Sequence, residues 1–186
     1  MNYLIAGLGN IGPEYADTRH NIGFMVLDEL VKQENVKFYH MRLAYYAEVK
    51  HKGRTLFLIK PTTYMNLSGK AVNHWMKELK IPVENVLIVA DEIALPFGTL
   101  RLKPKGSVAG HNGLKHIEAT LGHNNYARLR FGVGDNFPKG QQVNYVLDGF
   151  DKEELPELPA LIHRSIEMIK GFATIGTELT MTKYNK

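Results

Sequence analysis

Residues 86–90 read VLIVA, five apolar residues in succession, and they are followed directly by Asp91 and Glu92. An unbroken apolar run of this length, rich in β-branched side chains, is typical of a strand that is buried on both faces. A second short run at residues 3–6 ends in glycines and has the same character. Such strands occur in sheets that helices cover on both sides, so the sequence predicts an α/β architecture.

The segments on either side of this run alternate between strand and helix patterns. Further strands are predicted at residues 43–49, 55–59, 97–102 and 129–133, and helices at 21–33, 68–79, 114–121 and 155–175. The turn Lys52-Gly53-Arg54 joins two of the strands into a hairpin, which makes the sheet mixed. We therefore expect a three-layer α/β fold in a single domain, residues 1–186, with a mixed, mostly parallel, twisted sheet flanked by helices.

The composition excludes several classes of site. The chain has 186 residues, 44% of them hydrophobic, which suffices for one well-formed core. It has no cysteine, so disulfides, thiolate zinc sites, iron–sulfur clusters and a cysteine nucleophile are all excluded. The start, MNYLIAGLGNIG, lacks a basic leader, and no apolar run approaches the roughly 18 residues of a membrane helix. We expect a cytoplasmic protein without a membrane span.

The charge is mildly basic, with 23 Lys and Arg against 19 Asp and Glu and a net charge of +4. This excess fits a solvated surface as well as it fits a nucleic-acid partner. Arg101, Lys103 and Lys105 alternate along one segment, and Arg128 and Arg130 along another. Alternate residues of a strand share a face, so two such strands could form a basic rim that follows phosphates.

Residues 7–12, GLGNIG, match the G-x-G-x-x-G pattern of dinucleotide-binding sites. That motif requires a helix that begins within it, whereas here the polar stretch PEYADTR follows. Asp28 has the spacing of the ribose-binding acid but lies in a predicted helix. The glycines are better explained by a backbone turn that passes close to a ligand or another loop. A nicotinamide-dependent oxidoreductase remains the alternative.

Polar side chains gather where predicted strands end. Asn10, Asn66 and Asp91 each follow a predicted strand, and His20 and Asn112 lie in polar loops. Ligands of α/β sheets bind beyond the carboxyl ends of the strands. A neutral His can take a proton from water, an Asp can hold its other ring nitrogen, and amides can stabilise an oxyanion. These residue types together indicate hydrolytic chemistry.

Each of these residues also has a purely structural alternative. Asn21, Asn66, Ser68 or Asn112 could cap the helix that follows, and Asp91 could begin a turn. A zinc site is not expected, because none of the eight histidines forms an H-x-x-x-H or H-E-x-x-H pattern.

Four long stretches resemble those of bacterial peptidyl-tRNA hydrolases, in the same order and spacing: GLGNIGPEYADTRHNIGF, KPTTYMNLSGKAV, VADEIALPFGTLRLKPKGS and AGHNGLKHI. The resemblance implies a single-domain, usually monomeric esterase that needs no metal or cofactor. It also implies a substrate, peptidyl-tRNA that has left the ribosome early, and a reaction, hydrolysis of the ester between the peptide and the 3′-terminal ribose.

The resemblance also implies roles for individual residues. His20 matches the catalytic base, Asp91 the residue that orients it, and Asn10 the amide that discriminates a blocked peptidyl end. The remaining matches bind substrate: Asn66 and Asn112 around the scissile ester, Tyr15 and Tyr64 near the tRNA end, and Lys103 and Arg130 at tRNA phosphates.

The chain departs from the family pattern at two places. Ile93-Ala94 stands where Leu-Asp is usual, and Val108-Ala109 replaces a smaller pair before Gly110. These changes bear on substrate affinity and leave the reaction class intact. The family also includes RNA-splicing relatives that act as protein–RNA adaptors, so an adaptor is a second alternative. All the catalytic matches are present, which favours the enzyme.

Overall fold

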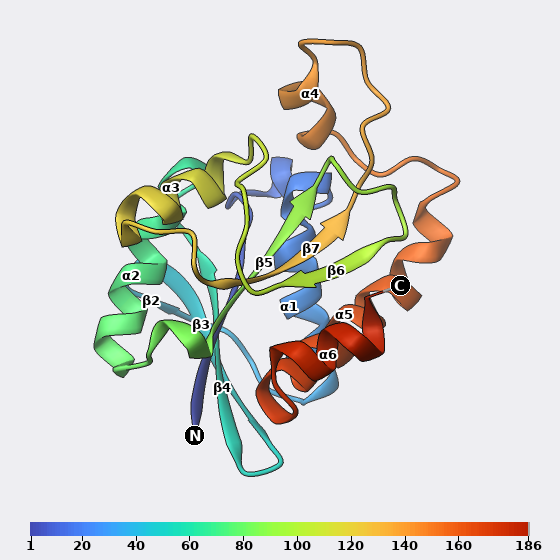
Figure 1. Ribbon diagram of the computed structural model, residues 1–186. Helices are drawn as coiled ribbons and strands as arrows, with labels where there is room; N and C mark the ends of the chain where they lie inside the picture. Colours follow the sequence, from blue (N-terminus) through green and yellow to red (C-terminus); the bar gives the residue numbers. More distant parts are fainter. Residues whose placement is uncertain (186) are drawn as a thin grey trace.

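Seven strands form one twisted sheet in the computed structural model, which describes residues 1–185 (Figure 1). Their spatial order is β2-β3-β4-β1-β5-β7-β6. The four central strands, β4, β1, β5 and β7, pair in parallel, and the strands at both edges pair antiparallel. The bounds are β1 Asn2–Gly7, β2 Tyr39–Met41, β3 Ala44–His51, β4 Arg54–Pro61, β5 Val86–Glu92, β6 Leu100–Lys103 and β7 Ala127–Gly132.

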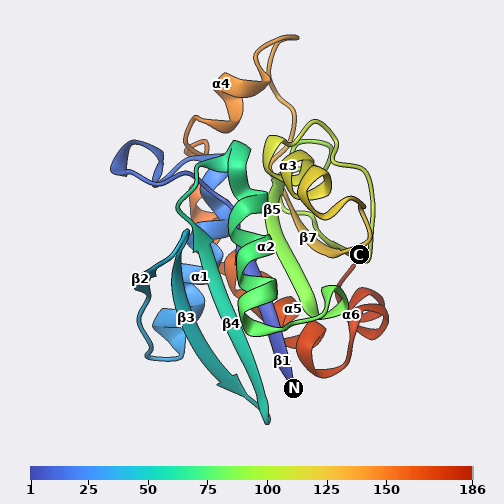
Figure 2. The same ribbon diagram turned by 90° about the vertical axis from the view of Figure 1, so that its left-hand side faces the viewer.

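Helices cover both faces of the sheet (Figures 1 and 2). Helices α1 (Ile22–Gln33) and α5 (Leu158–Thr174) lie on one face, and α2 (Ser68–Leu79) and α3 (Asn112–Leu121) on the other. Along β5, Leu87 and Val89 pack into the first layer and Ile88 into the second, all fully buried. The predicted three-layer α/β fold, with a mixed sheet and helices on both faces, is confirmed.

The other described helices lie at the periphery. Helix α4 (Gln142–Val146) stands beyond the carboxyl end of the central strands, and α6 (Thr177–Tyr184) packs on α5 and β6 (Figure 1). Among residues 1–185 no helix is both long enough and apolar enough to cross a membrane.

Several predicted bounds were wrong. The strand expected from residue 97 begins only at Leu100, because the chain turns at Pro96–Thr99 with Gly98 at a φ of 95°. The helix expected from residue 155 opens with a 3-10 turn, and α5 itself begins at Leu158. The elements β2, α4 and α6 were missed. Each is short, so apolar periodicity has few residues in which to show.

Glycines allow α1 to approach the ends of β1 and β5 closely. A Cβ on Gly23, in the first turn of α1, would lie 2.5 Å from the Leu8 nitrogen and 2.6 Å from the Val89 oxygen. A Cβ on Gly7 would collide with the Gly23 carbonyl. Helix α1 begins only at Ile22, well after GLGNIG. Gly7 of that motif thus serves the backbone packing of α1, and this packing brings the residues before α1 to the end of β5.

Candidate active site

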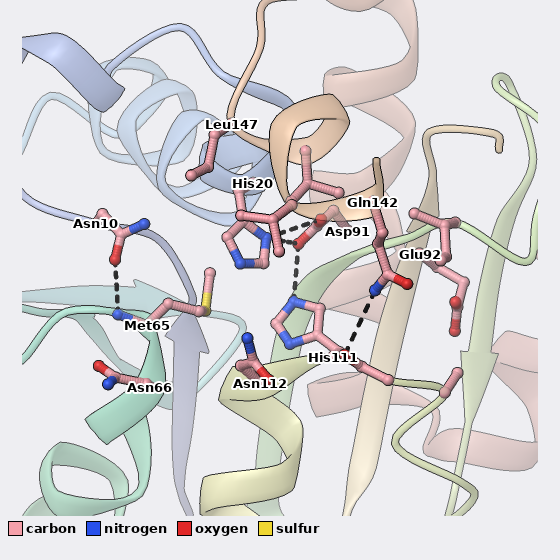
Figure 3. A pocket seen from close by; sticks show the side chains of 15 residues that line it. Asn10, His20, Met65, Asn66, Asp91, Glu92, His111, Asn112, Gln142 and Leu147 are labelled. Carbon is pink, nitrogen blue, oxygen red and sulfur yellow. Dashed lines mark hydrogen bonds and ion pairs between the residues drawn. The ribbon is translucent and has the colours of Figure 1, made fainter. Parts of the chain in front are cut away.

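A cavity of about 260 Å³ opens beyond the carboxyl ends of the central strands (Figure 3). Its wall combines residues from loops and strand ends that are far apart in the sequence. Among them are five predicted site residues, Asn10, His20, Asn66, Asp91 and Asn112. The fold therefore brings these five residues together, which the sequence alone could not show.

His20 and Asp91 form a buried hydrogen-bonded pair at the centre of this cavity. His20 lies in a 3-10 turn, Arg19–Asn21, and its Nδ1 is 2.9 Å from each carboxylate oxygen of Asp91. A carboxylate accepts hydrogen bonds, so Nδ1 carries the proton of the neutral ring. The other nitrogen, Nε2, is then unprotonated and turned into the cavity (Figure 3). This is the arrangement that a general base requires.

A second histidine, His111, also forms a hydrogen bond with Asp91. It is the N-cap of α3, where its Nδ1 accepts hydrogen bonds from the backbone N–H groups of Gly113 (3.1 Å) and Leu114 (3.2 Å). Its Nε2 lies 2.8 Å from Asp91 Oδ1. Sequence reasoning considered Asn112 as the cap and assigned no role to His111. The sequence did offer one signal for a role of His111, its position in a polar loop between Gly110 and Gly113, just before a predicted helix.

The electrostatics of the pair keep Asp91 ionised. Burial acts to lower the pKa of His20, but the charge and hydrogen bond of Asp91 outweigh it, and the net shift is upward from 6.5. Burial acts to raise the pKa of Asp91, but His20 and His111 together bring it well below its usual range. Asp91 thus remains a carboxylate beside the His20 ring, and it can stabilise an imidazolium formed there.

The donor atoms of His20, Asp91 and His111 lie within 4.8 Å of one another, a grouping that a metal ion can use. A histidine must present an unprotonated nitrogen to a metal. The backbone donors at Nδ1 of His111 place its proton on Nε2, the atom that faces Asp91. His20 likewise directs its N–H at Asp91. These hydrogen bonds fit a triad of side chains joined to each other better than a ligand set.

Asn10 is held in place by a neighbouring amide. The side chain of Asn21 accepts from the Asn10 backbone N–H and donates to the Asn10 carbonyl, both at 2.8 Å. The Asn10 Oδ1 accepts from the Met65 backbone N–H at 2.7 Å, which leaves its Nδ2 group available on the side of His20 (Figure 3). Asn21, considered only as a helix cap, makes no cap hydrogen bond and instead clamps this loop.

Helix α4 and the residues after it cover the cavity. Val143, Val146 and Leu147 contribute apolar side chains to its wall. Arg19, next to His20, anchors this segment: its guanidinium donates to the Tyr145 carbonyl at 2.9 Å and lies 3.9 Å from the centre of the Tyr145 ring. The same group pairs with Asp151 at 3.0 Å. Sequence reasoning found neither α4 nor this role of Arg19.

A model of the family described as peptidyl-tRNA hydrolase matches residues 4–186. The chain belongs to the peptidyl-tRNA hydrolase family. It is 61% identical to the peptidyl-tRNA hydrolase of Cytophaga hutchinsonii, over 100% of this chain and 98% of that protein. It is 58% identical to that of Phocaeicola vulgatus over the full length of both. The crystal structure of peptidyl-tRNA hydrolase from Acinetobacter baumannii matches with a TM-score of 0.92 and 32% identity, covering 98% of this chain and 94% of that one.

The residues that family resemblance links to tRNA lie outside the cavity wall. Tyr64 is 49% exposed, and Tyr15 is half-buried in the 3-10 turn Pro13–Tyr15. Lys103 is half-buried on β6. Arg130, on β7, pairs with Glu92 at 3.1 Å and donates to the Ser107 carbonyl at 2.7 Å.

The basic rim is smaller than the alternation of charges suggested. The register places Arg101 opposite Arg130 and Lys103 opposite Arg128, so the four cations do share one face. Arg128, however, is fully buried, with its guanidinium 4.0 Å from the centre of the Tyr126 ring. It is therefore unavailable to a polyanion.

The two departures from the family pattern both touch the cavity. Ile93 lines it, so an apolar side chain lies in the wall directly after Asp91 and Glu92. Ala109 also lines it and adopts a left-handed backbone with a φ of 49°. That conformation is costly for a residue other than glycine.

Proposed function

We propose that this chain hydrolyses the ester bond between the peptide carboxyl end and the 3′-terminal ribose of peptidyl-tRNA, releasing tRNA and peptide. Membership in the family supports the substrate. The single observation that carries the reaction is the buried His20–Asp91 pair, which leaves His20 Nε2 free as an acceptor at the cavity.

The proposed first step is attack by water. His20 Nε2 takes a proton from a water molecule as its oxygen bonds to the ester carbonyl carbon, and Asp91 stabilises the imidazolium that forms. The tetrahedral intermediate then collapses, the bond to the ribose 3′-oxygen breaks, and Nε2 returns the proton to that oxygen. General-base assistance of this kind contributes roughly 10²–10⁴-fold in rate.

Amide groups are proposed to bind the substrate around the reacting carbon. Asn10 presents its Nδ2 beside His20, and Asn66 and Asn112 present exposed amides on the cavity wall. An amide donor can stabilise the developing oxyanion without adding a charge, and one such donor contributes about 10²–10³-fold. Asn10 is further assigned the discrimination of a blocked peptidyl end from a free aminoacyl end.

The tRNA is proposed to extend from the cavity across the β6–β7 side. Lys103 and Arg130 would meet its phosphates, and Tyr15 and Tyr64 would stack on its unpaired end. The pairing of Arg130 with Glu92 means that Lys103 carries more of the free positive charge. We also propose that the protein acts as a cytoplasmic monomer without metal or cofactor.

The test is release of peptide from N-blocked aminoacyl-tRNA by the purified protein, with a chelator present. Unblocked aminoacyl-tRNA and the His20→Ala variant are assayed in parallel. We expect cleavage of the blocked substrate only, and its loss in the variant. Retained cleavage in the variant would assign the base elsewhere, and tRNA binding without cleavage would favour the adaptor.

A further inference from the structure

His111 is a buried titratable group that the proposed mechanism does not use. It is 8% exposed, and each of its ring nitrogens already has a defined partner. Its ring centre lies 4.9 Å from that of His20, with Asp91 hydrogen-bonded to both rings. A side chain that caps a helix with one nitrogen and contacts the orienting carboxylate with the other connects α3 to the reaction centre.

We propose that His111 is a positioning residue for catalysis: α3 determines its tautomer, and that tautomer directs an N–H at Asp91, which in turn orients His20. This inference rests on the proposed function and adds a third residue to the pair. His111 acts through Asp91 and not on the reacting atoms, because its two ring nitrogens are bonded to Asp91 and to the backbone of α3.

The backbone at the start of α3 permits only one neutral form of His111. Two N–H groups point at Nδ1, so a proton there would face two donors and leave both without an acceptor. The proton is therefore on Nε2, which donates to Asp91 Oδ1 at 2.8 Å. The neutral imidazole is determined by its second hydrogen bond, as is common for functional histidines.

The donation from His111 limits how Asp91 can be arranged. Both oxygens of Asp91 lie 2.9 Å from His20 Nδ1, and Oδ1 also receives the His111 bond. Two donors from neighbouring histidine rings hold the carboxylate, and the carboxylate holds the His20 ring with Nε2 toward the cavity. Without His111 a buried carboxylate would lose one of the partners that offset its desolvation.

Few other charges face His20. On β5 the neighbouring acid, Glu92, is paired with Arg130. Arg19, adjacent in the chain, is paired with Asp151. Helix α4 packs over the turn that holds His20, and its one titratable side chain, Tyr145, donates to the Val133 carbonyl. The titration of His20 therefore reports mainly on Asp91 and on what His111 does to it.

Two substitutions separate the catalytic contact from the helix cap. In His111→Asn the amide stands near the position of Nδ1, where Asn is a favoured cap, but no N–H reaches Asp91. In His111→Gln the amide stands near the position of Nε2 and can donate to Asp91, while the cap is lost. Each variant thus removes one of the two hydrogen-bonding functions of the His111 ring and keeps the other.

The proposal predicts opposite effects of these two variants on kcat and on thermal stability. For His111→Asn we expect wild-type thermal stability, KM within a factor of two, and kcat lower by about tenfold or more, the scale of one lost hydrogen bond to a carboxylate. Its acid limb in kcat against pH should move upward, because the charge of Asp91 is then less neutralised. For His111→Gln we expect a lower melting temperature but kcat within about threefold of wild type, assayed well below that temperature.

The opposite pattern, with His111→Asn fully active and His111→Gln inactive, would overturn the proposal and leave His111 a helix cap only. Equal kcat losses in both variants would also overturn it. The ¹⁵N chemical shifts of the His111 ring give an independent readout, which should show a proton on Nε2 alone. Failure of the wild-type protein to cleave blocked aminoacyl-tRNA would instead count against the proposed function, and the ring tautomer would still test the inference.

Discussion

The buried centre of the cavity and its exposed rim are organised in opposite ways. At the centre, His20, Asp91 and His111 hold one another, and Asn21 holds the loop of Asn10 through two hydrogen bonds. At the rim, Asn66 and Asn112 are exposed. The centre is thus held in place by its own hydrogen bonds, whereas the rim amides face solvent. Pre-arranged groups contribute to the rate without a cost of reorganisation at the moment of reaction.

The sharpest test of this contrast removes the proposed base and keeps the contact with Asp91. In His20→Asn the amide stands near the position of Nδ1 and can still donate to Asp91, but no group replaces Nε2. We expect kcat to fall by about 10³-fold or more with the melting temperature nearly unchanged. Single-turnover cleavage of blocked aminoacyl-tRNA and a thermal melt measure the two. A loss of less than tenfold would show that His20 is not the base.

The acid limb of the pH profile tests the electrostatics of the centre. The pKa of His20 is raised above 6.5, and the proposed role as general base requires a neutral ring. We therefore expect kcat/KM to fall about tenfold per pH unit below a midpoint higher than 6.5. The same shift stabilises the fold fully below 6.5, and that contribution is lost as the pH rises through the raised pKa. Activity and this part of the stability therefore change in opposite directions.

The Asp91→Asn variant is the control for that profile. Removal of the carboxylate charge should move the acid limb to lower pH, because the charge of Asp91 is what raises the pKa of His20. An unchanged midpoint in this variant would mean that another group controls the limb.

Stability should separate the two regions more clearly than activity. Asn21→Ala removes two buried hydrogen bonds and should lower the free energy of unfolding by about 1–3 kcal/mol. Asn66→Ala, on the rim, should change it by less than about 0.5 kcal/mol while it still lowers kcat/KM. Urea titration of both variants measures the difference. Similar losses of stability in the two variants would contradict the idea that the rim residues contribute little to the stability of the fold.

The smallest expected effect is at the outer surface. Lys103→Ala should weaken the binding of full-length tRNA substrates by a few-fold and that of short ester substrates hardly at all. It should also reduce the slope of log affinity against log salt concentration by about 1. Lys32→Ala, in the last turn of α1, is the charge-matched control and should leave the slope unchanged. Equal losses of activity on both substrates would mean that Lys103 contributes to folding or to catalysis instead of to tRNA binding.

Many of the strands and helices were predictable from the sequence because apolar runs and periodicity are properties of a few neighbouring residues. The buried strand at 86–90 and the helix at 68–79 follow from apolar runs and from helical periodicity, and both are in the structure. Three residues of the centre, Asn10, His20 and Asp91, were also named from the sequence, as polar groups at strand ends and in loops and by family resemblance. In each case the pattern lies within a few consecutive residues.

What the sequence by itself determined is therefore the layered fold and the set of polar side chains at the ends of its strands. Only the tertiary structure decided which of them meet: His20 and Asp91 are 71 residues apart, Asp91 and His111 20 apart, and Arg128 alternates with Arg130 yet is fully buried. The physical reason is that a hydrogen bond or a desolvated charge depends on which surfaces pack together. That packing is set by contacts such as Gly23 against the ends of β1 and β5.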